Sequence, residues 1–83
     1  MAEHVKLLKH LRKIFPDADC WLNISWCPDV KCYALTLDLD FGQEECCMCS
    51  IGLTKKQRQD EAIVWAKFLW CCDELLKSTG RKK

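Results

Sequence analysis

The sequence predicts a single α+β domain over residues 1–83: a helix, a three-stranded antiparallel meander and a long C-terminal helix, with both helices on one face of the sheet. Three observations lead to this fold class. Residues 31–41 alternate between apolar and polar side chains, as a strand with one buried face does. Residues 2–15 place apolar side chains three and four apart, as an amphipathic helix does. Residues 62–72 form an apolar run inside a second, longer helical segment.

The first helix is expected over residues 2–15 and ends before Pro16, because the residue preceding a proline is pushed out of the α region. One side is apolar and the other is mostly basic. We expect the basic side to be solvated, with contact to phosphates or to a membrane surface as the alternative. The apolar positions are Val5, Leu7, Leu8, Leu11, Ile14 and Phe15, and the polar positions are Lys6, Lys9, His10, Arg12 and Lys13.

Three strands are expected over residues 20–27, 31–41 and 44–51. Pro28-Asp29 and Gly42-Gln43 supply the turns between them. Because the connections are short, neighbouring strands pair as antiparallel hairpins. The central strand directs one row of large apolar side chains towards the helices, namely Tyr33, Leu35, Leu37, Leu39 and Phe41.

The last helix is expected over residues 54–78. Thr54 is a suitable N-cap, and Gln57 three positions later completes a capping box. Gly80 follows the last turn and suits a helix stop. A helix on the outside of a small domain needs an apolar stripe on one side only, but this one is apolar nearly all the way round.

The apolar run of residues 62–72 therefore exceeds what one neighbouring layer can cover. We expect the side with Trp65, Phe68, Leu69 and Cys72 to seal the leucine face of the sheet. The short arc of Trp70, Ile63 and Lys67 then remains as a candidate partner-binding surface. The alternative is that so small a domain uses every apolar side chain in its own core.

The composition places few global constraints on function. Hydrophobic residues make up 49% of the chain and charged residues 30%, a balance typical of globular proteins. The net charge of +1 gives no general attraction to nucleic acid or to anionic membranes. The apolar run is too short to span a membrane, and charges interrupt the N-terminal segment where a signal peptide needs an apolar stretch. We expect a cytoplasmic protein with reduced thiols.

Eight cysteines raise the question of metal or redox chemistry. Cys46 and Cys49 have CxxC spacing, but residues three apart in a strand point to opposite faces. We expect most of the thiols to be small buried hydrophobic groups and expect no cofactor. A structural zinc site or a thiol redox site remains an alternative, and Cys27 with Cys32 is the pair placed for a cross-strand disulfide. Further metal ligands would be drawn from Cys71, Cys72, His4 and His10.

No constellation in the sequence is typical of a catalytic site, and we expect no enzymatic activity. A cysteine nucleophile needs a nearby histidine base, and both histidines lie on the first helix. Asp38 and Asp40 share one strand face and have the spacing to hold a divalent cation, although a solvated outer face is the expected role. No glycine-rich phosphate loop, nucleophile elbow or zinc-protease helix occurs.

The order of elements resembles that of the double-stranded-RNA-binding domain. Residues 52–62 are similar to the loop with which that family enters its last helix, where lysines meet phosphates. The resemblance covers about a dozen residues, and the sequence lacks the Gly-Pro-His pattern that the family carries after its first strand. It implies a nucleic-acid surface made of Lys6, His10, Lys13, Lys55, Lys56 and Arg58.

The leading interpretation is a small non-enzymatic binding protein of the inhibitor or adaptor type, for which phage-encoded anti-defence proteins offer an analogy. Its partner would be a protein or a protein–nucleic acid assembly, or a second copy in a homodimer. Contact would be made through the apolar helix or through an acidic sheet face that mimics phosphates. That face comprises Asp38, Asp40, Glu44 and Glu45.

Overall fold

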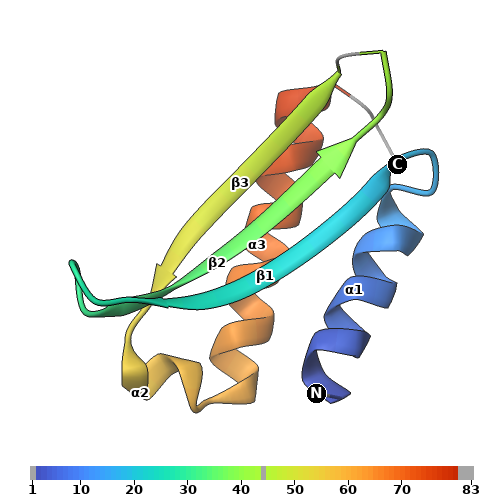
Figure 1. Ribbon diagram of the computed structural model, residues 1–83. Helices are drawn as coiled ribbons and strands as arrows, with labels where there is room; N and C mark the ends of the chain where they lie inside the picture. Colours follow the sequence, from blue (N-terminus) through green and yellow to red (C-terminus); the bar gives the residue numbers. More distant parts are fainter. Residues whose placement is uncertain (1, 44, 81–83) are drawn as a thin grey trace.

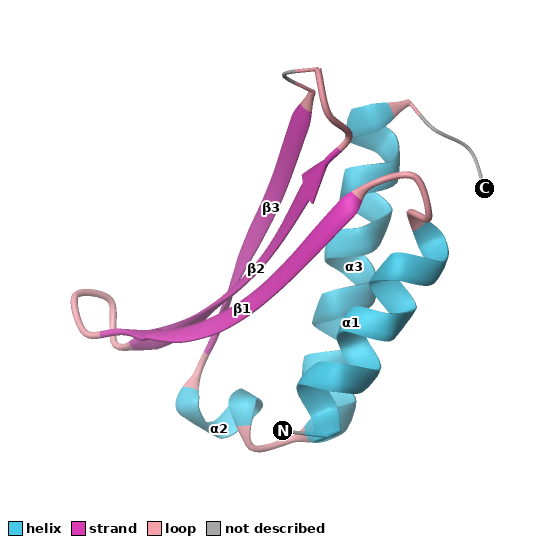
Figure 2. Cartoon of the chain, turned by 45° about the vertical axis from the view of Figure 1, so that its right-hand side comes forward, coloured by secondary structure: helices cyan, strands magenta, loops and turns pink. Residues whose placement is uncertain are grey.

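The computed structural model describes residues 2–43 and 45–80, with side chains described from Val5 onward. Three antiparallel strands form one sheet in the order β1-β2-β3, and α1 and α3 both pack on one face of it (Figure 1, Figure 2). The predicted α+β fold is confirmed. The elements are α1 (Ala2–Ile14), β1 (Asp19–Cys27), β2 (Cys32–Asp40), β3 (Cys46–Leu53), α2 (Lys55–Arg58) and α3 (Glu61–Thr79).

The strand register divides the sheet into an inner and an outer face. On the inner face, Leu35 lies between Ile24 of β1 and Ile51 of β3. Directly opposed residues in antiparallel strands point to the same side, so this row faces the helices. The outer face carries Thr36 between Asn23 and Ser50, and the Thr36 and Ser50 hydroxyls lie 3.1 Å apart.

The hydrophobic core fills the space between the inner sheet face and the two helices. Its central members are almost fully excluded from solvent, as expected for the leucine row of the predicted central strand. Burial of this set is the dominant favourable contribution to folding. The buried residues are Leu7, Leu11 and Phe15 near or on α1, Cys20, Leu35, Leu37, Leu39 and Leu53 from the sheet, and Val64, Phe68, Cys71, Cys72 and Leu75 on α3.

The structure divides the predicted C-terminal helix into two. The expected capping box is present: Gln57 N donates to Thr54 Oγ1 and Thr54 N donates to Gln57 Oε1, both at 3.1 Å. The capping box begins only the single turn of α2, however, because Asp60 adopts an extended conformation and begins a second helix, α3. The segment before this turn differs too: β3 runs to Leu53, two residues beyond the predicted strand.

Asp60 causes this interruption by acting as an N-cap itself. Its Oδ1 accepts hydrogen bonds from the backbone N–H of Ala62 at 3.0 Å and of Ile63 at 3.4 Å. A side chain that satisfies otherwise unpaired N–H groups favours a new helix start over a continuous helix. At the other end Gly80 adopts the left-handed conformation, with φ of 68°, and ends α3 at the predicted position.

Replacing this cap gives a first testable expectation. Asp60→Ala is expected to lower the free energy of unfolding by about 1 kcal/mol, because two N–H groups of α3 lose their acceptor. Urea denaturation followed by circular dichroism measures the change. Asp60→Asn keeps an acceptor and should lose far less; equal losses in the two variants would show that the cap contributes nothing specific.

Candidate functional site

A groove of about 510 Å³ lies between α1 and α3. One wall is made by α1 and the other by residues 66–76 of α3. The lining is mainly apolar, with a histidine and a carboxylate among the contributors. The residues are His10, Ile14, Ala66, Leu69, Trp70, Cys72, Asp73 and Leu76.

The apolar excess of α3 explains this groove. Val64, Phe68 and Leu75 point into the core and are at most 1% exposed. Leu69 and Trp70 lie on other sides of the helix and remain 39% and 51% exposed. The prediction that Leu69 seals the leucine face is therefore wrong. A three-stranded sheet covers only one side of a helix, so the remaining apolar side chains meet solvent.

His10 fixes the contact between the two helices at one end of the groove. Its ring centroid lies 5.3 Å from that of Trp65 and 5.9 Å from that of Phe68. Lys6 and Lys13 lie four residues before and three residues after His10, so they lie on its side of α1, and both are exposed. The α1 rim of the groove is therefore basic, whereas Asp73 lines the α3 side.

The one thiol that lines the groove, that of Cys72, is a poor nucleophile near neutral pH. Cys72 is 2% exposed, and burial raises its pKa from 9.0 to about 12, with a smaller contribution from Cys49. A thiol with so high a pKa stays protonated near neutral pH, and the thiolate is the nucleophilic form. The presence of His10 along the same groove does not change this, so the geometry suits binding through apolar contact.

The predicted arc of Trp70, Ile63 and Lys67 lies along one side of α3, as the helical spacing requires. Lys67 is engaged within the molecule: its Nζ donates to the carbonyl of Gly52 at 2.8 Å and to Oε1 of Gln57 at 3.0 Å. It thereby joins α3 to the end of β3 and to α2. Ile63 is half-buried against the core, and Trp70 is the exposed member of the three.

The predicted acidic face forms part of the outer side of the sheet. Asp38 lies between Trp21 and Met48, which are 53% and 67% exposed. Asp40 has a structural role, because its Oδ1 accepts hydrogen bonds from Gly42 N at 2.8 Å and from Cys46 Sγ at 3.7 Å. Glu45 follows the turn and is exposed, whereas the predicted Glu44 lies outside the described residues.

The predicted nucleic-acid residues occupy separate regions. Lys55 lies over the Trp26 ring, with Nζ 5.1 Å from the centroid, and Arg58 lies 6.0 Å from the Tyr33 ring. These cation–π contacts hold α2 against the far end of the β1–β2 hairpin. Lys56 is exposed, and Lys6 and Lys13 lie on α1. His10 packs against Trp65 and Phe68, and Lys6 and Lys13 flank it on the solvent-exposed side of α1.

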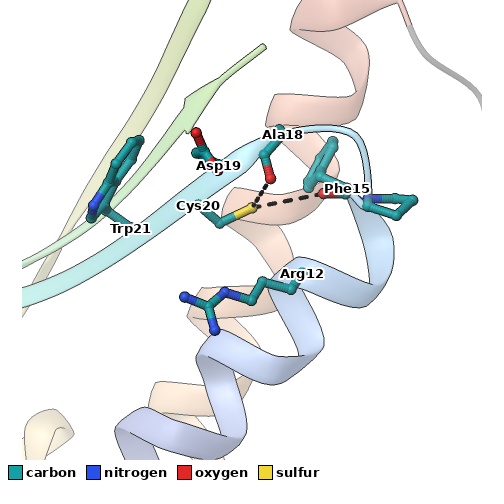
Figure 3. A pocket seen from close by; sticks show the side chains of 7 residues that line it. Arg12, Phe15, Ala18, Asp19, Cys20 and Trp21 are labelled. Atoms are coloured by element: carbon teal, nitrogen blue, oxygen red, sulfur yellow. Dashed lines mark hydrogen bonds between the residues drawn. The ribbon is translucent and has the colours of Figure 1, made fainter. Parts of the chain in front are cut away.

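A second hollow, of about 360 Å³, lies at the start of β1 beside the end of α1 (Figure 3). Cys20 forms its inner side, with Sγ donating to the carbonyls of Phe15 at 3.8 Å and Ala18 at 3.6 Å. Arg12 reaches along the open edge of β1, and Trp21 lies on the outer side of the same strand (Figure 3). Sequence patterns gave no indication of this hollow, because it depends on how the loop 15–18 turns.

Three further observations concern metals, membranes and thiols. Among the residues that the structure describes, no three histidine, cysteine, aspartate or glutamate side chains converge as metal ligands. Within residues 2–43 and 45–80, no helix has the length and apolar character needed to cross a bilayer. All eight cysteines are free thiols.

Comparison with known proteins adds no family assignment. The chain has no significant match among protein-family models, curated proteins or solved structures.

Proposed function

We propose that the protein is a small non-enzymatic binding protein of the inhibitor or adaptor type, acting in the cytoplasm. In this proposal it holds an amphipathic helical segment of a partner protein in the groove between α1 and α3. The observation that carries the proposal is the half-exposed Trp70 beside Leu69 at an apolar groove. Tryptophan is among the residues most enriched at the energetic hot spots of protein interfaces.

The shape and chemistry of the groove support a helical occupant. A partner helix inserts apolar side chains three and four residues apart into a groove of this kind. Ile14, Leu69 and Leu76 offer apolar contacts for such a row. The buried thiol of Cys72 contributes only apolar surface, since burial keeps it protonated.

The rims of the groove define the charge of the partner. Lys6 and Lys13 make the α1 rim basic, and Asp73 places a carboxylate on the α3 side. A partner helix that is acidic along the side facing α1, with a basic residue opposite Asp73, is complementary to both rims. Such charges set the orientation and the rate of association more than the final affinity.

The test compares Trp70→Ala with Trp21→Ala in affinity purification from the native cell, followed by calorimetry with the partner segment that is identified. Both tryptophans are about half exposed, but only Trp70 lines the groove. Trp70→Ala is expected to weaken binding by about 2 kcal/mol, or roughly thirtyfold. Trp21→Ala should bind like the wild type.

Other outcomes would redirect the proposal. Loss of the partner in Trp21→Ala and its retention in Trp70→Ala would place the interface on the acidic sheet face. Capture of nucleic acid that is lost after Lys55→Glu and Arg58→Glu, with affinity falling steeply as salt rises, would favour a nucleic-acid module instead. Either result contradicts binding through the groove.

A further inference from the structure

The sheet has two edges, and the pattern of hydrogen bonds shows which backbone groups each edge presents. The N–H of Phe41 donates to the carbonyl of Glu45 at 2.9 Å. In an antiparallel sheet the residues of a central strand alternate between bonding to one neighbour and to the other. The bond from Phe41 to Glu45 shows that the odd-numbered residues of β2 bond to β3, so its even-numbered residues bond to β1. With these registers, the even-numbered residues of β1 and of β3 turn their N–H and C=O groups away from β2, towards the open edges of the sheet. On β1 these are Cys20, Leu22, Ile24 and Trp26.

The edge of β3 is protected against further pairing. The outward carbonyl of Gly52 already accepts a hydrogen bond from Lys67 Nζ at 2.8 Å. A lysine at a sheet edge is a common device against unwanted strand addition, and a glycine inside a strand weakens pairing. Two features of β3 thus oppose addition of another strand.

The residues of β1 itself give its edge no such protection. From Cys20 to Cys27 the strand contains no charged residue, proline or glycine, and its pairing with β2 continues without a bulge. A long, regular and uncharged edge strand is a template for another strand. Among the described residues, no further strand pairs with this edge, since the order is β1-β2-β3.

Apolar side chains beside this edge stay partly exposed on the inner side of the sheet. The helix α1 lies close to the start of β1 and diverges from it towards its own N-terminus (Figure 1, Figure 2). Val5 is 50% exposed, and Leu8 and Arg12 follow it at helical spacing on the same side of α1. Leu22 and Ile24 on β1 are only half-buried.

We propose that β1 pairs antiparallel with β1 of a second copy, joining two sheets into one of six strands. With the twofold axis at Asn23, the outward-facing residues pair as Leu22 with Ile24 and as Cys20 with Trp26, each twice about the axis. This register uses the even-numbered residues that present free N–H and C=O groups. It also continues the apolar inner face from one copy to the other.

A second copy is favoured as the occupant because the strand is complementary to itself. The charged residue of β1, Asp19, falls opposite Cys27 of the other copy, so no like charges meet. Asn23 meets its own equivalent on the outer face, where two amides can exchange hydrogen bonds. Trp26 of the second copy falls opposite Cys20, beside the hollow and the Arg12 guanidinium (Figure 3).

The test measures mass by light scattering over roughly a hundredfold range of protein concentration. The wild type is expected to approach twice the 9.7 kDa of one chain as the concentration rises. Asn23→Lys places two lysines against each other at the axis and should weaken the dimer by more than tenfold. Ser50→Lys is the matched control, because Asn23 and Ser50 flank Thr36 in the same row of the sheet. It should remain dimeric.

Amide hydrogen exchange of the wild type provides a readout that does not depend on the variants. The N–H groups of Leu22 and Ile24 should gain protection as the concentration rises, while those of β3 that face outward should not. A wild type that stays monomeric throughout would overturn the proposal. So would a dimer that survives Asn23→Lys, since its interface would then lie elsewhere, for example in the groove between α1 and α3.

Discussion

Phe68→Ala is expected to lower the free energy of unfolding by about 3–5 kcal/mol. Phe68 is fully buried, stacks on Trp65 with ring centroids 5.6 Å apart and meets the edge of His10 at 5.9 Å. Its removal leaves a cavity where α1, α3 and the sheet meet. A chain of 83 residues has roughly 4–12 kcal/mol of stability in total, so this one change removes a large share of it.

Thermal and urea unfolding measure this effect. For a domain of this size, 1 kcal/mol corresponds to about 4–8 °C, so the melting temperature should fall by roughly 12–40 °C. Leu69→Ala is the matched control, because the neighbouring residue on the same helix is 39% exposed. It should lose less than about 1 kcal/mol. Similar losses in the two variants would mean that the core does not centre on Phe68.

The fold could be predicted because the central strand has a clear pattern. Its alternation places Leu35, Leu37 and Leu39 on one side, and all three are at most 1% exposed. The neighbouring strands follow from short turns, which leave little choice of pairing. The predicted ends of α1 and β1 differ from the observed ones by a single residue. Where the hydrophobic periodicity and the turn residues favour the same secondary structure, the local preference of the chain agrees with the overall fold.

The division between α2 and α3 could not be predicted from periodicity. Thr54 and Asp60 both cap helices, and their spacing allows either one long helix or two. Lys55 and Arg58 lie over Trp26 and Tyr33, and this contact with the hairpin accompanies the two-helix arrangement. The aromatic partners lie 29 and 25 residues earlier in the chain, in β1 and β2, beyond the range of a local pattern.

The candidate site was predicted only in part. The excess of apolar residues on α3 pointed to Trp70, which is exposed at the groove. The partner wall of α1, with His10 and Ile14, depends on how far apart the two helices pack, and spacing along one helix does not reveal this distance. Helical spacing groups Lys67 with Trp70, but the long side chain of Lys67 reaches the carbonyl of Gly52 in β3.

The cysteines form the least regular pattern in the sequence, and the structure gives them different environments. Cys46 is exposed on the outer face of the sheet, whereas Cys71 and Cys72 on α3 are at most 2% exposed. Burial raises the pKa of both Cys71 and Cys72 from 9.0 to about 12, and Cys49 on the facing strand adds to the effect. These two thiols should therefore make folding sensitive to alkaline pH.

The free energy of unfolding is expected to fall as the pH rises from about 9 towards 12. Because the pKa of each thiol is higher in the folded state than in the unfolded chain, the full stability is present below pH 9. Above it, the unfolded chain releases protons that the folded core retains. At about 1.4 kcal/mol per pKa unit, the two thiols together should lower the free energy of unfolding by roughly several kcal/mol at the upper end of this range. Urea denaturation at successive pH values measures the slope.

Two variants separate the buried thiols from other groups that titrate at high pH. Cys71→Ala with Cys72→Ala removes both buried thiols and should flatten most of the alkaline slope, even if its stability at pH 8 is lower because of the lost side-chain volume. Cys46→Ala removes an exposed thiol, whose pKa is also raised by desolvation and by Asp40, and should keep most of the wild-type slope because solvent screens an exposed group. An unchanged slope in the double variant would mean that other side chains cause the alkaline unfolding. The two helical cysteines would then act in the core only as small apolar groups, with no part in its response to pH.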